Sequence, residues 1–433
     1  MFSWRTRWRI FEYVRNSIWL VPALFMTLAI VLGIALPDLD ASVDTTLGIT
    51  YGSGAAQGML GAIVSGMITF TGFVFSILLL AVQFGSSQFS PRMLRRFLRD
   101  PTTKFALGIF MMTFMYSLLV LRTIGADGNE NFVPDNSISV ALLMLLASMI
   151  MFLRLISTTT QGLRVASVTG DLARETAKVI DRIYPDRVED RDRLEPDPDP
   201  REGRSSRVVT YERHPGILQS VDARGLVEIG QETDTVIELI PTTGDLLAPE
   251  TPLFRIWGES QAVDEARLQN SIATGDERNL RQDPAFGFRL LADISSKALS
   301  PGVNDPTTSI QALDQIELLL KMLARRRLTP GSLESAAGQV RLIYPTSTWE
   351  SFLSLALDET RYFGQTSFQV MRRLRALLEG LRDWAPEHRR PAVEHQLGLL
   401  ESSVERSYDV PAESTFAGAA DRQGIGSPQA PTR

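Results

Sequence analysis

Four long apolar segments before residue 157 constrain the fold more than any other feature of this sequence. They run from about Ile18 to Leu36, Gly58 to Phe84, Phe105 to Leu121 and Ile138 to Leu155. As a helix rising ~1.5 Å per residue, the first would be roughly 28 Å long, enough to cross the core of a bilayer. A cleaved signal peptide is the alternative for this segment, but the long apolar run lacks a small-x-small cleavage site at its end. The sequence therefore predicts a domain of four transmembrane helices, residues 17–156.

Charge alternates between the loops that join these segments. Arginine and lysine precede the first segment and separate the second from the third, at Arg5, Arg7, Arg9, Arg15, Arg92, Arg95, Arg96, Arg99 and Lys104. Acidic residues without lysine occupy the first loop, and more follow Arg122, at Asp38, Asp40, Asp44, Asp127, Glu130 and Asp135. By the positive-inside rule, both termini are expected in the cytoplasm.

Residues 1–16 are predicted to form an amphipathic helix in the headgroup layer. Trp4, Trp8 and Phe11 fall near one helical face, and arginines occupy the rest. Such a helix anchors a protein to the surface of a bilayer. Membrane lipids are therefore expected partners.

The second segment carries two stripes of small or polar residues. Small residues at every fourth position, Gly54, Gly58, Ala62 and Gly66, allow another helix to approach closely. The adjacent stripe holds Ser65, Thr69, Gly72 and Ser76, and Gln83 follows near the polar end of the helix. Its hydroxyls either bond helix backbone in a packed seam or line a path for ions or small solutes. A path through single helices requires several subunits, so the second alternative predicts a homo-oligomer.

The remainder predicts a cytoplasmic α+β region. Helical and β-type patterns divide it into a stalk helix (157–184), a charged disordered linker (185–207), a small β-domain (208–258), a helical bundle (259–408) and a disordered tail (409–433). The segment from Thr243 to Ile256 resembles part of the barrel-sandwich hybrid fold of biotinyl and lipoyl carriers. No lysine stands between Lys178 and Lys297, so a covalent carrier is excluded and no cofactor is predicted.

A turn-rich stretch in the helical part offers a second candidate site. Ser300-Pro301-Gly302 has turn chemistry, Asp305 is a plausible N-cap, and Pro306 suits the first position of the next helix. The alternative is a polar ligand or subunit contact formed by Asp293, Lys297, Asn304 and Asp305.

Two motifs carry a family resemblance. The sequences TGFVFSILLLAVQFGSSQFSPR, from Thr71 to Arg92, and DISSKALSPGVNDPTTSI, from Asp293 to Ile310, resemble the bacterial predicted-membrane-protein family called domain of unknown function 2254. The resemblance implies the architecture above and a bacterial inner-membrane location, and it brings no activity or catalytic residues.

Several function classes lack their usual residues. The sequence has no GxSxG elbow, P-loop, GxGxxG after a strand or HExxH, so no catalytic residue is assigned and an enzyme is not expected. The absence of cysteine and the wide spacing of His214, His388 and His395 argue against a metal site, and a net charge of -6 argues against nucleic acid. Two hypotheses remain: an oligomeric channel with a cytoplasmic vestibule, and a membrane-anchored scaffold or sensor that binds a partner or small ligand through the 300–308 loop.

Overall fold

The chain folds into two compact units. The computed structural model describes residues 3–42, 49–88, 100–124, 132–162, 164–188, 199–259, 263–328 and 331–426. The membrane unit comprises Phe11–Ser167, and the α/β unit comprises Met1–Ile10 with Val168–Arg433. The predicted basic loop from Arg92 to Arg99, acidic loop residues Asp44, Asp127 and Glu130, residues 189–198 of the predicted linker and the last residues of the tail lie outside the described residues.

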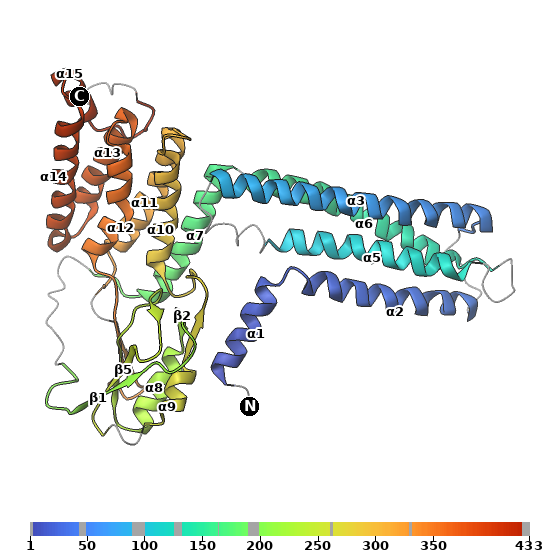
Figure 1. Ribbon diagram of the computed structural model, residues 1–433, viewed down its shortest axis with the longest axis horizontal. Coiled ribbons are helices and arrows are strands. Elements are labelled where there is room, and N and C mark those ends of the chain that lie inside the picture. Colours follow the sequence, from blue (N-terminus) through green and yellow to red (C-terminus); the bar gives the residue numbers. More distant parts are fainter. Residues whose placement is uncertain are drawn as a thin grey trace. The chain divides into compact units, whose positions relative to one another are not determined.

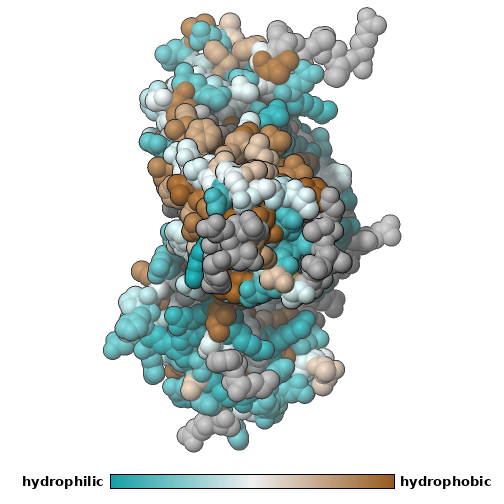
Figure 2. All heavy atoms as spheres, turned by 90° about the vertical axis from the view of Figure 1, so that its right-hand side faces the viewer, coloured by the Kyte–Doolittle hydropathy of each residue, from teal (hydrophilic) through white to brown (hydrophobic). Residues whose placement is uncertain are grey.

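The membrane unit contains the four predicted apolar helices. They are α2 (Leu20–Ser42), α3 (Ser53–Gln88), α5 (Pro101–Thr123) and α6 (Asp135–Gly162), and α1 (Trp4–Asn16) precedes them. All four are long and apolar enough to cross a membrane, and they run alongside one another (Figure 1). Large apolar side chains stay exposed on them, among them Leu24, Phe75 and Leu153, and hydrophobic surface is visible in the space-filling view (Figure 2). The prediction of four membrane-length helices is confirmed.

Helix α5 is the most enclosed of the four, and glycines bring α2 close to it. A Cβ added to Gly33 of α2 would lie 2.9 Å from the Leu119 side chain, and one added to Gly108 of α5 would lie 2.9 Å from the Phe25 ring. Real side chains essentially never approach so closely. The two helices therefore pack at a distance that only glycine permits at these positions.

Hydrogen bonds join α2 and α5 to the start of α6. The Asp40 carboxylate on α2 accepts hydrogen bonds from the Ser137 backbone N–H (2.8 Å), the Ser137 hydroxyl (2.7 Å) and the Asn136 amide (2.9 Å). The Tyr116 hydroxyl of α5 donates to the Ser137 carbonyl at 3.0 Å. A carboxylate at the first turn of α6 satisfies backbone donors that have no partner within the helix.

The α/β unit contains two small sheets. The strand order of the first is β1-β5-β3-β8-β7, and that of the second is β4-β2-β6. Their bounds are β1 (Ser206–Thr210), β2 (Gly216–Val221), β3 (Val236–Leu239), β4 (Leu246–Leu247), β5 (Pro252–Trp257), β6 (Ile272–Gly275), β7 (Gly331–Glu334) and β8 (Val340–Tyr344). Helices α8 (Ala223–Glu232) and α9 (Glu265–Asn270) complete this part.

The sheets differ from the predicted division into a β-domain at 208–258 and a helical bundle at 259–408. Helix α8 lies inside the first range, and strands β6, β7 and β8 lie inside the second. Strand β8 pairs in parallel with β3, with Ile237 opposite Leu342. A partner about a hundred residues away leaves no local signal in the sequence, so the sheet is larger than its first segment indicates.

Helices form the rest of this unit. They are α7 (Val165–Ile183), α10 (Pro284–Ala298), α11 (Pro306–Leu323), α12 (Trp349–Gly364), α13 (Phe368–Trp384), the 3-10 turn η4 (Glu387–Arg389), α14 (Arg390–Ser407) and α15 (Pro411–Ala417). Buried hydroxyls join three of them: Ser295 of α10 bonds Ser309 of α11 at 2.7 Å and Thr360 of α12 at 2.9 Å.

Two expectations about the ends of this region need correction. Helix α7 is separate from α6 and is packed, not a free stalk, since the Thr176 hydroxyl would lie 2.1 Å from a Cβ on Gly287 of α10. The predicted disordered tail is folded up to residue 426. There, α15 packs against α13, and the Asp421 carboxylate accepts from the backbone N–H groups of Gly424 (3.0 Å) and Gly426 (2.8 Å).

Candidate functional site

The small and polar residues of α3 face away from the rest of the membrane unit. Its buried side chains follow one helical face, at Ala56, Leu60, Ile63, Met67, Val74 and Ala81. Most stripe residues stand two positions from one of these, which is about 200° around a helix of 3.6 residues per turn. The outward set comprises the predicted Gly54, Gly58, Ala62, Ser65, Gly66, Thr69, Gly72, Ser76 and Gln83, and all nine are exposed. The two predicted stripes thus form one outward face, named here the α3 outer face.

Hydroxyls on the α3 outer face are already bonded to their own helix. Ser65 donates to the Gly61 carbonyl at 2.8 Å, Thr69 to the Ser65 carbonyl at 3.2 Å, and Ser76 to the Gly72 carbonyl at 3.0 Å. Such bonds make hydroxyls inexpensive in an apolar environment, and each oxygen keeps capacity to accept another bond. The face can therefore meet lipid, another helix or water.

The glycines on this face have open space before them. A Cβ added to Gly54, Gly58, Gly66 or Gly72 meets no described atom within 4 Å. Gly33 and Gly108 in the α2–α5 contact have neighbours at 2.9 Å. Within the described part of one chain, nothing accounts for the small residues of α3.

The turn between α10 and α11 is held by its own residues. Asn304 has a φ of 48°, and Asp305 caps α11 by accepting from the Thr308 backbone N–H at 3.1 Å and from the Thr308 hydroxyl. Asp293 accepts from Arg289 at 2.6 Å, and the Lys297 carbonyl accepts from the Ser300 hydroxyl at 2.7 Å. Pairing and capping therefore engage the carboxylates of Asp293 and Asp305, whereas Lys297 and Asn304 hold the turn through backbone hydrogen bonds with Ser300.

Two arginines of α13 are buried. Arg372 and Arg373 are 1% and 5% exposed. Arg373 donates to Asp314 at 2.9 Å and to Glu317 at 2.5 Å, both on α11. Arg372 lies over the Phe416 ring at 4.2 Å and donates to the Ala419 carbonyl at 3.1 Å. These cations join α13 to α11 and to the folded tail.

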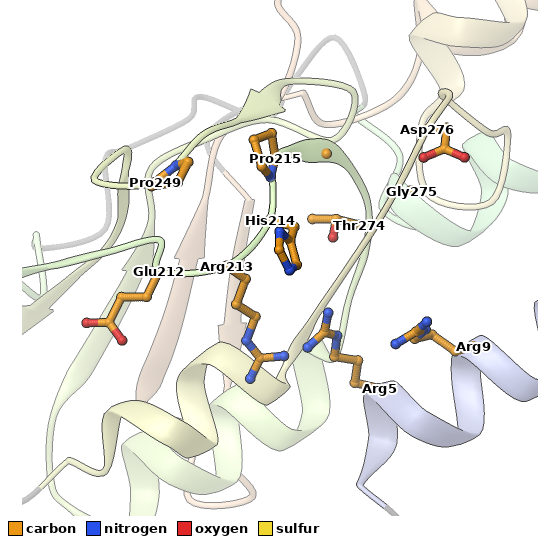
Figure 3. A pocket seen from close by; sticks show the side chains of 11 residues that line it. Arg5, Arg9, Glu212, Arg213, His214, Pro215, Pro249, Thr274, Gly275 and Asp276 are labelled. Carbon is orange, nitrogen blue, oxygen red and sulfur yellow. The ribbon is translucent and has the colours of Figure 1, made fainter.

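A pocket of about 810 Å³ in the α/β unit collects cations from distant parts of the sequence. Arg5 and Arg9 of α1 line it together with Arg213 and His214, which lie between β1 and β2. Figure 3 shows the Arg5 and Arg213 guanidinium groups and the His214 ring directed toward one space. Two carboxylates, Glu212 and Asp276, also line the pocket, and in the same view they lie away from these groups (Figure 3). We call this the basic pocket.

Local structure fixes one side of the basic pocket. Arg213 donates to the Asn270 side-chain oxygen at 2.9 Å, and the buried Tyr211 hydroxyl donates to the His214 carbonyl at 2.8 Å. On the other side, burial lowers the pKa of the Arg5 guanidinium; the Tyr211 hydroxyl opposes this effect, and the nearby Arg9 cation adds to it. Among the described residues, no carboxylate forms an ion pair with Arg5 or Arg9.

No sequence pattern indicates the basic pocket, because Arg5 and Arg213 are about two hundred residues apart. The amphipathic pattern predicts that Arg5 and Arg9 lie on the polar side of a membrane-surface helix. Their spacing of four residues does place them on one helical face. In the described part of the chain, no group of three His, Asp or Glu residues is arranged to hold a metal ion.

Four membrane-length apolar helices joined to a mixed α/β unit define a multi-spanning membrane protein. Residues 15–380 match the family described as "Predicted membrane protein (DUF2254)", and the chain belongs to that family. It is also similar to the uncharacterized proteins Mb1321c of Mycobacterium bovis and Rv1290c of Mycobacterium tuberculosis. Each is 28% identical over 426 residues, covering 95% of this chain and 81% of the relative. No solved structure matches the chain.

Proposed function

We propose that this protein is an oligomeric membrane channel in which α3 helices from several copies surround a path for ions or small solutes. The observation that carries the proposal is the α3 outer face, whose small residues and hydroxyls are uncovered in a single chain. Small residues let helix backbones approach closely, and in lipid such packing is a main source of helix association. A second copy of this chain supplies the missing helix.

The α3 outer face carries hydroxyls that can meet water at a central axis, beside the exposed apolar side chains Phe73, Leu79 and Leu80. Helix α3 is 36 residues long, or roughly 54 Å at ~1.5 Å per residue, so its outer face extends beyond a ~30 Å hydrocarbon core. Hydroxyls such as Ser65, Thr69 and Ser76 each retain a lone pair that can bind water or a passing cation. The face carries no carboxylate or lysine that would mark a proton-coupled site.

The same proposal gives the chain an orientation. The alternating loop charges support an orientation with both termini in the cytoplasm of a bacterial cell and the four helices in its inner membrane. The α/β unit then forms a cytoplasmic vestibule or regulatory domain. If its 208–258 segment has the barrel-sandwich character suggested by Thr243 to Ile256, it binds rather than carries a group, because it has no lysine.

Oligomeric state in detergent tests the assembly. Mass photometry should find several copies of the wild-type chain in one particle. A Gly58→Leu, Gly66→Leu double variant should shift the particles toward monomer, although a Cβ at either position meets no described atom within 4 Å. Ala147→Leu, on an exposed position of α6, is the matched control and should keep the wild-type mass. A monomeric wild-type protein would refute the proposal.

Ion flux tests the path itself. Proteoliposomes with the wild-type protein should release a trapped cation faster than empty vesicles. Thr69→Leu and Ser76→Leu should each change that rate by about tenfold if the hydroxyls face the axis. Leu146→Phe on α6 should leave it unchanged, because that exposed side chain lies on a different helix. An oligomer without flux would keep the assembly and reject the channel.

A further inference from the structure

We propose that the basic pocket binds a phosphate-bearing anion between the guanidinium groups of Arg5, Arg9 and Arg213. The inference rests on the α/β unit alone and does not depend on the channel. Its first support is the size of the site: the open pocket has a volume of about 810 Å³, within the roughly 300–1,000 Å³ range of pockets for small ligands. Its second support is charge.

Positive charge is in excess where Arg5 and Arg9 line the pocket. Arg5 and Arg9 stand one helical turn apart on α1, so their like charges repel each other. Burial makes this more costly for Arg5, whose pKa is lowered for that reason. Holding such groups together without an anion costs free energy, and a bound anion would recover it. The carboxylates of Glu212 and Asp276 lie away from these groups (Figure 3).

The chemistry of the donors selects the class of anion. A guanidinium group presents paired N–H donors that match the oxygens of a phosphate or a carboxylate. Three such groups around one space suit the two charges and several oxygens of a phosphate better than the single charge of a carboxylate. Arg213 is held for this by its bond to Asn270. His214 and Thr274, also in the lining, add polar groups beside the anion.

Occupancy of the pocket would have a consequence for α1. This helix would be tied through the anion to the segment before β2, and α1 is separated from α2 by residues 17–19 only. Two sources share the required chemistry: a free phosphate compound and the phosphate headgroup of an anionic lipid. Binding of either would order α1 against the β-strands, so the state of α1 reports occupancy.

The first arm of the test uses a free anion. The full chain in a neutral detergent should bind inorganic pyrophosphate saturably in isothermal titration calorimetry, at constant ionic strength. Arg5→Gln and Arg213→Gln should each weaken binding by about tenfold or more, since each removes charge-assisted hydrogen bonds. Arg7→Gln is the matched control: Arg7 is exposed on α1, about 200° from Arg5 and Arg9, and should bind within about twofold of wild type.

The second arm identifies a lipid source. Full-length protein is placed in nanodiscs of phosphatidylcholine with or without phosphatidic acid, and hydrogen exchange is followed over residues 4–10. Slower exchange that requires phosphatidic acid, and is lost in Arg5→Gln but not in Arg7→Gln, supports the headgroup. Pyrophosphate binding with the same dependence supports a free phosphate. Absence of both effects, or equal loss in Arg7→Gln, overturns the proposal. Circular dichroism of each variant, with Arg5→Lys as a charge-retaining version, separates lost binding from lost folding.

Discussion

The membrane unit and the α/β unit bring their helices together by opposite means. In the membrane unit, α2 and α5 approach through missing side chains at Gly33 and Gly108. In the α/β unit, α11 and α13 are joined through one of the largest side chains, Arg373, which two carboxylates neutralise. Lipid offers no hydrophobic drive for helices to associate, so close backbone packing matters there, whereas water rewards burial and paired charge.

Each unit also has a surface that resembles its internal helix contact but has no partner on it. The α3 outer face has the spaced glycines of the α2–α5 contact without a facing helix. In the basic pocket, by contrast, no carboxylate among the described residues forms an ion pair with Arg5 or Arg9, although Glu212 and Asp276 are part of the lining. The α2–α5 contact is therefore a reference for the α3 outer face, and the Arg373 contact is a reference for the basic pocket. Variants at a contact that has its partner and at a surface that lacks one should differ in their effect.

The largest effect is expected at the filled arginine site. Replacing Arg373 with Met keeps much of the side-chain volume but leaves Asp314 and Glu317 without their shared cation. Breaking a buried pair by removing one partner should lower the free energy of unfolding by about 3 kcal/mol. Hydrogen exchange of the α11 and α13 amides in the full chain should report the loss as faster opening.

Arg382→Met provides the control for this variant. Arg382 lies on the same helix, but its side chain is 42% exposed, and its nearest acidic partner is the adjacent Asp383 at 3.4 Å. Exposed pairs contribute little. If Arg382→Met and Arg373→Met accelerated exchange equally, burial would not distinguish the two arginines and the comparison would lose its basis.

Features encoded within short stretches of sequence could be predicted. Each membrane helix depends on its own apolar run, so the four runs predicted the four helices. The cap at Asp305 followed by Pro306 at the start of α11 was also a local pattern, and the structure confirms it. Except at the start of α2, which begins at Leu20 and not at Ile18, the helices extend beyond their predicted apolar runs, because caps and polar turns lengthen a helix past its apolar part.

Features that depend on distant partners could not be predicted. Ile237 pairs with Leu342 across the first sheet, and neither segment identifies the other. No local pattern marks Arg373 as buried, because its carboxylate partners lie on α11. The basic pocket needs Arg5 and Arg213 together. The α3 outer face could be predicted in part. The spacing of its small residues is a local pattern, but the side of the helix that faces outward depends on packing against α5.

The next effect compares filled and open glycines in the membrane unit. Gly108→Leu would place its Cβ 2.9 Å from the Phe25 ring, and overpacking of this kind costs about 2 kcal/mol. Thermal unfolding of the protein in detergent should begin at a lower temperature. Gly58→Leu has no atom within 4 Å of its Cβ, so it should leave the stability of the single chain unchanged and alter only assembly. If both variants unfolded alike as monomers, the α3 outer face would not be open.

The smallest effect concerns pH at the filled arginine site. Burial alone would raise the pKa of Glu317, but hydrogen bonds from Lys321 and Arg373 outweigh it, and the net pKa lies below the ordinary 4.5. A carboxyl whose pKa is depressed by folding stabilises the folded state above its unfolded pKa, and this contribution is lost as pH falls through the folded value. Wild-type α11 should therefore open more readily as pH falls from about 5 toward 3.

Glu317→Gln should lower the free energy of unfolding by about 1 kcal/mol at pH 7 and leave it unchanged at the acid end, where both chains carry a neutral group. Hydrogen exchange of α11 at both pH values, corrected for the intrinsic exchange rate, measures the difference. A gap between wild type and Glu317→Gln that did not narrow with acid would mean that Glu317 acts through shape and not through charge, and the opposition between the two units would then rest on Asp314 alone.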